Sequence, residues 1–226
     1  MVVGAVMPTW NQARFIADAV ASAWPQVDEL CIVNDGSTDG TAAWLEEFSQ
    51  ANDARDNLQI VTLPENGGTA DAINAGWSCL TGKADWITWV SSDNVMAPDW
   101  IEKLTAEIEP DVGVVYGGFT WAKPGTPGRY LFAPYDPDHL INDLNCFFGP
   151  AFIIRADVWQ SHRGAISHDY DNWLRVEEEC WRRDLRIVGV DADLSAYSAH
   201  DQRVTVTRRH EFDADKWQAE ARKRRA

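Results

Sequence analysis

The sequence has few cysteines and little positive charge, and these shortages exclude several classes of protein. Its 226 residues include four cysteines, widely spaced and without a C-x-x-C pair, which argues against both a zinc module and a disulfide scaffold. Lys and Arg number 20 against 35 Asp and Glu, which gives a net charge of −15. Sequence-independent binding to nucleic acid or to anionic membranes depends on clustered basic residues, so neither is expected as the main activity.

Long apolar runs are missing as well. No window approaches the roughly 18 continuous apolar residues of a membrane span, and the N-terminus lacks the basic and apolar regions of a signal peptide. Cys31 lies inside the apolar run 30–33, where a free thiol behaves as a small buried hydrophobe and fits a reducing compartment. We therefore expect a soluble, cytoplasmic protein.

What the chain does contain suits a globular α/β domain. Apolar residues make up 45% of the chain and include 12 Trp, enough for a full core, and the length fits one domain. The patterns predict strands at 2–7, 30–33, 59–63 and 86–90, and helices at 13–24, 41–48 and 69–80. This alternation predicts parallel strands buried on both faces and joined by crossover helices.

The second half of the chain is less regular. We expect a helix at 98–108, a strand at 112–116, a helix at 170–183, a strand at 185–190 and a helical tail at 210–226. The Gly/Pro-rich stretch 123–128 predicts a long loop or a hairpin tip. The basic run at 222–225 is either a solvated helix end or a patch for a membrane or a partner.

Polar loops follow three of the expected strands. They read Pro-Thr-Trp-Asn at 8–11, Asn-Asp-Gly-Ser-Thr-Asp at 34–39, and Ser-Ser-Asp-Asn at 91–94. In open α/β sheets ligands bind beyond the carboxyl ends of the strands, so these loops predict the binding site. Neither G-x-G-x-x-G nor G-x-x-x-x-G-K-[ST] occurs, which excludes a dinucleotide-binding fingerprint and a P-loop.

These loops belong to a longer set of motifs. The others are Asn66-Gly67-Gly68 with Asn74 and Gly76, Gly-Pro-Ala-Phe at 149–152, His-Asp-Tyr-Asp-Asn-Trp-Leu-Arg at 168–175, and His200. In this order and spacing, over residues 2–205, they resemble glycosyltransferase family 2, the inverting nucleotide-sugar enzymes. The resemblance implies the GT-A fold, an α/β fold with a Rossmann-like, mostly parallel central sheet flanked by helices and a smaller acceptor-side region.

The resemblance also implies a domain organisation in which different parts of the chain have different roles. It places a donor-binding half at 1–117, an acceptor-binding and catalytic half at 118–205, and a helical tail at 206–226. The activity it implies is transfer of a sugar from a nucleoside-diphosphate sugar, with UDP as the expected nucleotide, to a hydroxyl acceptor. That acceptor is a glycan, a lipid-linked sugar, a protein or a modified nucleotide, and nothing in the sequence chooses among them.

The donor site implied by the resemblance lies in the polar loops. Its residues are Pro8, Thr9, Trp10, Asn11, Asp35, Asp39, Gly67, Gly68, Asn74, Ser92 and Asp93. Trp10 can stack on a base, Asp39 can accept a hydrogen bond from a base N–H, and Ser92 can bond a ribose hydroxyl. The alternatives are a core tryptophan at position 10 and turn-forming roles for Asp35 and Asp39.

A diphosphate donor brings negative charge to an acidic protein. A divalent cation, manganese or magnesium, neutralises such charge and stabilises the leaving group. Asp93 is the expected ligand, and by resemblance His200 is a second one, although a lone histidine is more often structural. The family usually shows D-x-D where this chain has Ser91-Ser92-Asp93-Asn94, so one carboxylate remains. Asn94 adds an oxygen or caps the following helix.

The acceptor side carries the expected base. An inverting transfer needs a group that takes the proton of the attacking hydroxyl, and by resemblance this is Asp169, with Asp171 second. Gly149, His168 and Trp173 are expected near the acceptor, with Trp173 able to stack on a sugar face. The alternatives are acids favoured by the helix dipole and a core tryptophan at position 173.

Two further expectations remain open. Trp217 on the terminal helix can dock on a partner subunit, so a homodimer is one expectation, or it can dock on its own domain.

Ser91, Ser92, Ile73 and His168 depart from the family pattern. They motivate an alternative function, a catalytically silent homologue that binds a nucleotide-sugar or a glycan.

Overall fold

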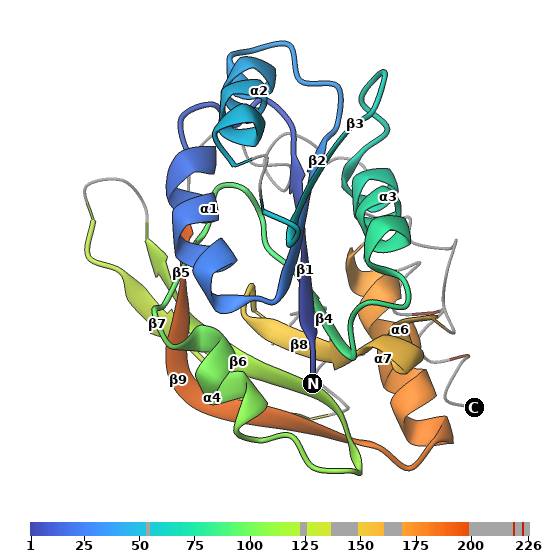
Figure 1. Ribbon diagram of the computed structural model, residues 1–226. Helices are drawn as coiled ribbons and strands as arrows, with labels where there is room; N and C mark the ends of the chain where they lie inside the picture. The colour runs from blue at the N-terminus through green and yellow to red at the C-terminus, as the bar shows by residue number, and fades with distance from the viewer. Residues whose placement is uncertain are drawn as a thin grey trace.

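A nine-stranded sheet in the order β3-β2-β1-β4-β8-β6-β9-β5, with β7 paired to β6, forms the centre of the protein (Figure 1). The structure is a computed structural model. It describes residues 1–52, 55–122, 126–136, 149–160 and 169–198, together with Ala219 and Lys223. Both of these last two residues are helical and exposed, in agreement with the helical tail expected there.

The first half of the chain forms the parallel part of the sheet, as predicted. Its strands are β1 (Val3–Thr9), β2 (Glu29–Asn34), β3 (Leu58–Thr62) and β4 (Trp86–Trp89). Its helices are α1 (Ile16–Ala23), α2 (Thr41–Ala51) and α3 (Thr69–Leu80), with a 3-10 turn η1 (Trp24–Gln26) after α1. β1 pairs in parallel with both β2 and β4, and β2 with β3, so a βα repeat builds this half.

The second half adds antiparallel pairings. Its strands are β5 (Val95–Met96), β6 (Val112–Ala122), β7 (Arg129–Leu131), β8 (Phe152–Arg155) and β9 (Arg186–Ser198). Its helices are α4 (Trp100–Thr105), α6 (Ala156–Gln160) and α7 (Asp169–Arg182). β8 lies antiparallel between β4 and β6, whereas β6 and β9 are parallel. β6 and β7, which flank the Gly/Pro-rich stretch, pair antiparallel, and residues 123–125 of that stretch lie outside the described residues.

The long strand β6 crosses the boundary at 117/118 that the sequence suggested. It continues to Ala122 and pairs with β9 along its length, and β9 itself continues to Ser198. Register shifts near Gly117 and Gly118 bend this pair, and these two glycines interrupt the apolar run that marked the strand. The donor-side and acceptor-side halves therefore share one sheet.

Each face of the sheet buries its own core. Because successive side chains of a strand point to opposite faces, β1 sends Val6 to one core and Ala5 and Met7 to the other. The first core lies under α3, α6 and α7, and the second under α1, α2 and α4. Cys31 is fully buried in the first core as a free thiol, as expected, and burial raises its pKa.

Within the described residues, no helix is both long and apolar enough to cross a membrane.

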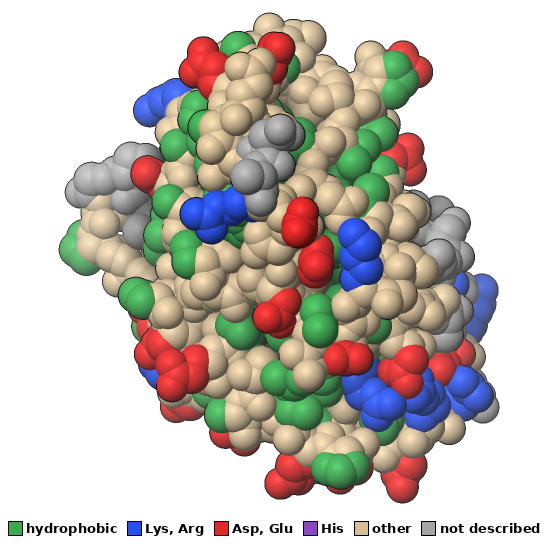
Figure 2. Space-filling view, viewed as in Figure 1, with side chains coloured by type: hydrophobic (Ala, Val, Ile, Leu, Met, Phe, Trp, Pro, Cys, Tyr) green, Lys and Arg blue, Asp and Glu red, His purple; other side chains and the backbone are tan. Residues whose placement is uncertain are grey.

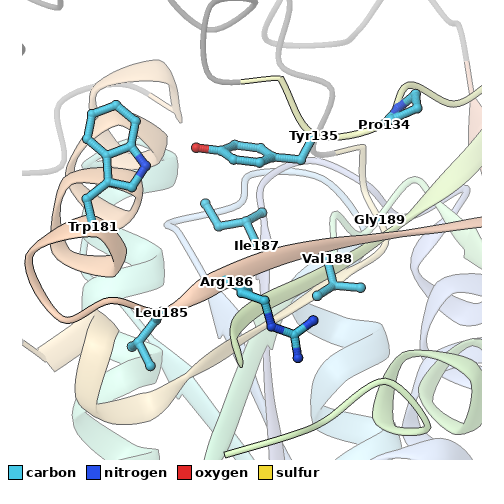
Figure 3. A pocket seen from close by; sticks show the side chains of 8 residues that line it. All are labelled: Pro134, Tyr135, Trp181, Leu185, Arg186, Ile187, Val188 and Gly189. Carbon is cyan, nitrogen blue, oxygen red and sulfur yellow. The ribbon is translucent and has the colours of Figure 1, made fainter. Parts of the chain in front are cut away.

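Charged side chains are scattered among uncharged ones on the face seen in Figure 2, and several Lys or Arg side chains lie together over α6 and α7. At the far end of α7 a pocket of about 440 Å³ opens between the rings of Tyr135 and Trp181, with Ile187 at its floor (Figure 3). Its Arg186 is hydrogen-bonded to Asp111. The pocket contains none of the residues that the sequence predicts for the site.

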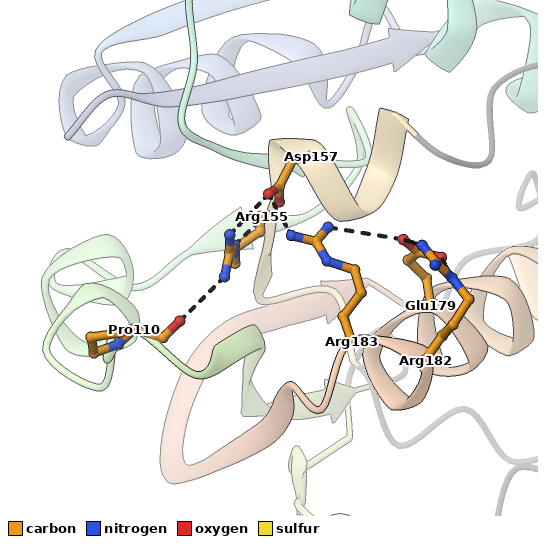
Figure 4. A network of polar contacts seen from close by, with 6 residues as sticks. All are labelled: Pro110, Arg155, Asp157, Glu179, Arg182 and Arg183. Atoms are coloured by element: carbon orange, nitrogen blue, oxygen red, sulfur yellow. Dashed lines mark hydrogen bonds and ion pairs between the residues drawn. The ribbon is translucent and has the colours of Figure 1, made fainter.

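The basic cluster is an ion-pair network that joins α6 to α7 (Figure 4). Asp157 accepts hydrogen bonds from Arg155 at 2.9 Å and from Arg183 at 2.6 Å, and Arg182 donates to Glu179 at 2.9 Å. Partial burial acts to raise the pKa of Asp157, but the hydrogen bonds from the two arginines outweigh it, and the pKa lies below its usual range.

Replacement of Gly76 by Ala tests how closely α3 packs on β1. A Cβ at this position would overlap the side chain of Val6 and lie 3.1 Å from Val33 Cγ2. We expect Gly76→Ala to lower the free energy of unfolding by about 1–3 kcal/mol, although Ala favours helix. Ser78→Ala, at an exposed position of the same helix, is the control and should change it by less than about 0.5 kcal/mol. Urea unfolding measures the free energy of unfolding of both variants. Equal effects would contradict the close packing of α3 on β1 at Gly76.

The ion-pair network gives a pH-dependent contribution to stability. Since the pKa of Asp157 is lowered in the folded state, its contribution is present above the unfolded pKa and is lost as the pH falls through the folded value. The side chain is 51% exposed, so we expect Asp157→Asn to cost only about 1 kcal/mol near pH 7. The difference in melting temperature between the two proteins should shrink below about pH 4. If the difference in melting temperature were the same at pH 3 as near pH 7, ionised Asp157 would not be the source of this stability.

Candidate functional site

The predicted loops meet at one end of the sheet. Strands β2, β1 and β4 are parallel neighbours, so the loops that follow them emerge side by side (Figure 1). Thr9 and Asn34 form the last register pair of β1 and β2, and the Asp35 N–H donates to the Thr9 carbonyl at 2.9 Å. The sequence expectation that these loops converge is borne out by this arrangement.

Pro8 explains why the loop after β4 parts from β1. The Val3 and Thr9 carbonyls accept bonds on the β2 side, so the alternate residues of β1, including Pro8, face β4. The last bond between these strands runs from the Val90 N–H to the Val6 carbonyl at 2.9 Å. Because Pro8 has no N–H, the ladder stops there, and the 91–94 loop separates from β1. β1 itself continues to Thr9, one residue beyond the proline that was expected to stop it.

Asn11 fastens the first loop to the second. Its backbone has φ of 54°, the left-handed region in which Asn is tolerated. Its N–H donates to Ser37 Oγ at 3.0 Å, and its Oδ1 accepts from the Thr38 N–H at 2.8 Å and the Asp39 N–H at 3.3 Å. The preceding Trp10 is left 45% exposed beside this loop, so the core alternative for Trp10 is wrong.

Asp39 is an ionised acceptor at the start of α2. It accepts from the Thr41 N–H at 2.8 Å and from the Ala13 N–H at 3.2 Å. Partial burial acts to raise its pKa, but the hydrogen bonds from Thr41 and Ala13 outweigh it, and the pKa lies below the usual range. Its side chain is exposed, and carboxylate oxygens have more than one lone pair, so it can accept a further bond.

Asp35 holds the glycine loop in place. Its carboxylate is 3% exposed and accepts from the N–H groups of Gly67 at 2.8 Å and Gly68 at 2.9 Å, just before α3. Gly68 has φ of 94°, a conformation that requires glycine. These two N–H groups thus have a partner within the chain, and a contact of Gly67 or Gly68 with a donor stays a prediction that must use other atoms.

The sequence did not reveal this bridge. The visible signals were a carboxylate directly after a buried strand and a Gly-Gly pair 32 residues later, but their pairing depends on the β2–β3 register. Asn74, a further predicted donor residue, is half-buried in α3.

The loop after β4 holds polar groups that lack partners. Ser92 is buried, Asp93 is half-buried, and Asn94 is 1% exposed. Neither the amide nitrogen nor the amide oxygen of Asn94 has a hydrogen-bond partner within the described structure, and the same holds for Thr9 Oγ1. Buried polar atoms normally find partners, so these groups are available for hydrogen bonds at the strand ends.

One alternative for Asn94 is wrong. α4 begins at Trp100, and its N-cap position is Asp99, so Asn94 does not cap that helix. Instead the Asn94 N–H donates to the Ser91 carbonyl at 3.0 Å and closes a turn.

β5 brings the Asp93 loop to the end of β9. Val95 is the register partner of Ala196, and Met96 of Ser195, in an antiparallel pair. β5 starts two residues after Asp93, and β9 ends two residues before His200. The Asp93 loop therefore leads into a strand that pairs with the last described residues of β9, whereas His200 lies outside the described residues and its role as a ligand stays a prediction. In the part of the chain that the structure describes, no three His, Cys, Asp or Glu side chains form a metal-binding group.

The acceptor-side residues divide into two sets. Trp173 is 2% exposed and packs between Trp89, with ring centroids 5.6 Å apart, and Phe152, at 4.8 Å. A sugar cannot reach a ring so enclosed, so the core alternative is the correct one for Trp173. Gly149 is buried, and a Cβ there would overlap the ring of Phe119, so close packing explains this glycine.

The remaining predicted residues are only partly covered by the structure. Asp169 is the first residue of α7, but its side chain and that of Asp171 lie outside the described part, as does His168 altogether. Their roles at the acceptor side stay predictions.

The comparisons with known proteins agree with this architecture. The family model described as glycosyl transferase family 2 matches residues 5–157, which is more than half of the chain. The chain belongs to glycosyl transferase family 2, as its motifs suggested.

Curated relatives carry glycosyltransferase names. An uncharacterized glycosyltransferase of Haemophilus influenzae is 25% identical over 185 residues, covering 74% of this chain and 56% of the relative. The chondroitin synthase of Pasteurella multocida is 32% identical over 196 residues, covering 76% of this chain and 18% of that enzyme. The chain thus spans about half the length of the first relative and much less of the second.

Solved structures show the same fold. S. aureus TarS (residues 1–349) in complex with UDP-GlcNAc superposes with a TM-score of 0.67 at 17% identity, over 90% of this chain and 60% of that one. The mannosyltransferase PcManGT of Pyrobaculum calidifontis, in complex with GDP-Man and Mn2+, gives 0.65 at 16% identity, over 91% and 59%. The expected GT-A fold is confirmed.

Replacement of Asp35 by Asn tests the bridge to the glycine loop. The variant keeps one acceptor oxygen but places an NH2 group opposite the other backbone N–H, which then has no acceptor, so we expect the free energy of unfolding to fall by about 1–3 kcal/mol. Amide exchange at Gly67 and Gly68 should become faster. Asp39→Asn is the control, because Asp39 also accepts from two backbone N–H groups but is exposed, so water can replace the bond that is lost, and it should cost clearly less than Asp35→Asn. Equal losses in denaturant unfolding, or unchanged exchange at both glycines, would show that Asp35 does not hold the loop.

Proposed function

We propose that this protein is an inverting glycosyltransferase that moves a sugar from a nucleoside-diphosphate sugar to a hydroxyl acceptor, with UDP as the nucleotide. The observation that carries the proposal is that the loops 9–11 and 35–39 are hydrogen-bonded to each other at the carboxyl ends of β1 and β2, while the 91–94 loop follows β4, the neighbour of β1 on its other side. The TarS complex with UDP-GlcNAc supports UDP as the nucleotide, since TarS shares this fold.

The first two loops suit the base and ribose. Trp10 offers an exposed ring, and Asn11 links its loop to the one that carries Asp39. A base stacked on the indole would present its N–H edge to an acceptor, and Asp39 is an ionised acceptor in the same pair of loops. Thr9 Oγ1 and Ser92, both buried at the strand ends, are placed to bond the ribose.

The residues present fit a divalent cation only if the diphosphate supplies most of its ligands. Mg2+ and similar ions are commonly held by one or two carboxylates together with substrate phosphates, and the described part of the chain offers Asp93. We propose Asp93 and His200 as the protein ligands of manganese or magnesium, and the Mn2+ complex of PcManGT supports this choice. Such an ion supplies charge neutralisation of the departing diphosphate.

The transfer step assigns one role to α7. The acceptor oxygen forms a bond to the anomeric carbon on the face opposite the nucleotide, the bond from that carbon to the diphosphate oxygen breaks, and the hydroxyl proton passes to the carboxylate of Asp169. The nucleoside diphosphate departs with the bonding electrons. Asp169 heads α7, whose following turns are anchored in the core by Trp173 and Val176, so the fold fixes the position of this helix end.

A second function follows from the single carboxylate of the Asp93 loop. A protein that binds the donor without transferring its sugar needs the contacts to the nucleotide base and the ribose. It needs neither a metal ion nor a general base. The loop Ser91-Ser92-Asp93-Asn94 carries one carboxylate where the family usually shows two, and this departure motivates the alternative.

Nucleotide binding is the first test. We expect calorimetric titration of UDP, GDP and CDP to show binding of UDP that strengthens at least tenfold with manganese, a change of about 1.4 kcal/mol. Asp93→Ala should abolish the effect of manganese and keep the metal-free affinity, whereas Trp10→Ala should weaken binding with and without metal. Failure of all three nucleotides to bind would show that these loops do not form a nucleotide-sugar site.

Release of UDP from a UDP-sugar, measured with and without a panel of hydroxyl acceptors, separates the two functions. Asp169→Asn should keep UDP binding and lose transfer by a factor of roughly 10² or more, with Asp171→Asn as the matched control. Binding without any turnover by the unaltered protein would identify the donor-binding module instead.

A further inference from the structure

Two of the cysteines lie on the same face of the sheet, one in a strand and one in a helix. Cys31, in β2, is fully buried, and Cys79, in α3, is half-buried. Both are free thiols, and both pack in the first core. The function proposed above uses neither of them.

The packing of α3 on the sheet shows which way the helix runs. A Cβ at Gly76 would overlap the side chain of Val6, and a Cβ at Gly4 would lie 3.2 Å from Leu80 Cδ1. Leu80 lies four residues after Gly76 on the helix, whereas Gly4 lies two residues before Val6 on β1. α3 therefore runs antiparallel to the strands that it covers.

This direction places Cys79 over Cys31. Gly76 also packs against β2, since a Cβ there would lie 3.1 Å from Val33 Cγ2. Cys79 follows Gly76 by three residues and shares its face of the helix. Cys31 precedes Val33 by two residues and shares its face of the strand. About one turn forward along α3 and two residues back along β2, the Gly76–Val33 contact is thus followed by the pair Cys79–Cys31.

The two thiols interact. Burial raises the pKa of Cys31, and the neighbouring Cys79 thiol raises it further, while Lys83 acts in the opposite direction. The Cys79 S–H also donates to the Ala75 carbonyl at 3.6 Å. Because a thiol is a weak donor, this bond does little to keep the Cys79 sulfur away from Cys31.

We propose that Cys31 and Cys79 form a disulfide when the protein meets hydrogen peroxide, and that this bond fastens α3 to β2. Cys180 lies elsewhere, against Gly113 of β6, and Cys146 lies outside the described residues. Among the described cysteines, the packing of helix on strand therefore brings one pair together.

The half-buried thiol reacts first, because Cys31 is covered and cannot meet the oxidant. The Cys79 sulfur bonds to one peroxide oxygen, the O–O bond breaks and one water leaves, which makes Cys79 a sulfenic acid. The Cys31 sulfur then bonds to the Cys79 sulfur, the S–O bond breaks, and the hydroxyl leaves with the Cys31 proton as a second water. The two thiols lose two electrons in total, and the peroxide gains them.

The disulfide gives β2 and α3 a second attachment. Asp35, directly after β2, is bonded to Gly67 and Gly68, directly before α3. The disulfide joins the same two elements near their other ends. A cross-link between segments distant in sequence restricts the unfolded chain, so the oxidised protein is the more stable form.

Thiol titration in denaturant, after peroxide treatment of the folded protein, tests the pair. The variant Cys146→Ser removes the cysteine that lies outside the described residues and leaves three of the four. We expect one thiol to remain after treatment, and peptide mass mapping should find Cys31 joined to Cys79. The melting temperature should rise by about 5 °C, and dithiothreitol should reverse both changes.

Three outcomes would overturn the proposal. They are a thiol count that peroxide leaves unchanged, oxidation of Cys79 to a sulfinic acid without a cross-link, and a cross-link that leaves the melting temperature unchanged.

Moving the thiol by one position tests the geometry. Ser78 is exposed and lies about 100° around the helix from Cys79. In the Cys146→Ser protein, Ser78→Cys/Cys79→Ser keeps the number of thiols, but it should form no disulfide with Cys31 and show no shift in melting temperature. Circular dichroism of the reduced proteins checks that each variant folds. A cross-link that forms as fast from position 78 as from position 79 would show that the packing of α3 on β2 does not select the pair.

Discussion

The hydrogen bonds from Gly67 and Gly68 to the Asp35 carboxylate are the constraint on which the site depends. They join the loop after β2 to the start of α3. Asn11, in the loop after β1, is bonded to that loop after β2 as well. A buried carboxylate loses its hydration, and two N–H donors replace it. The cost of leaving either side unpaired keeps the loops together, so the polar surface at the strand ends is formed before any ligand binds.

The abundance of tryptophan has a structural explanation on the acceptor side. Trp89 and Trp173 pack against Phe152, Trp159 packs against Trp89, and Trp77 of α3 packs against Trp159, so the rings form a chain between β4, β8, α3, α6 and α7. Large rings fill the wide space between a sheet and helices that cross it, and each buries a large apolar area. This cluster fixes the direction of α7, and thereby the place of its first residue, Asp169. A Trp four residues into that helix suggested a sugar platform from sequence alone, but it is part of the support of the helix.

The sequence was most informative where local pattern decides structure. The runs 2–7 and 30–33 are apolar on both faces, which only strands buried on both faces require, and the polar residues after them mark the site. It was least informative where contacts between segments far apart in the sequence decide the structure. The antiparallel pairs of β8 and of β5 with β9 join residues up to about 100 apart, and no periodicity encodes them. The burial of Trp173 against Trp89 and Phe152 and the bonds of Asp35 to Gly67 and Gly68 also join residues far apart in the sequence.

The continuity of β6 limits how this molecule can move. Since β6 runs through residue 117 and β9 pairs with it on both sides of that residue, the described part of the chain shows no hinge at the boundary that the sequence suggested. Rotation of one half against the other would break sheet hydrogen bonds in the middle of the core. Larger movements must therefore come from segments at the rim, while the sheet keeps the loops at its strand ends at a fixed spacing.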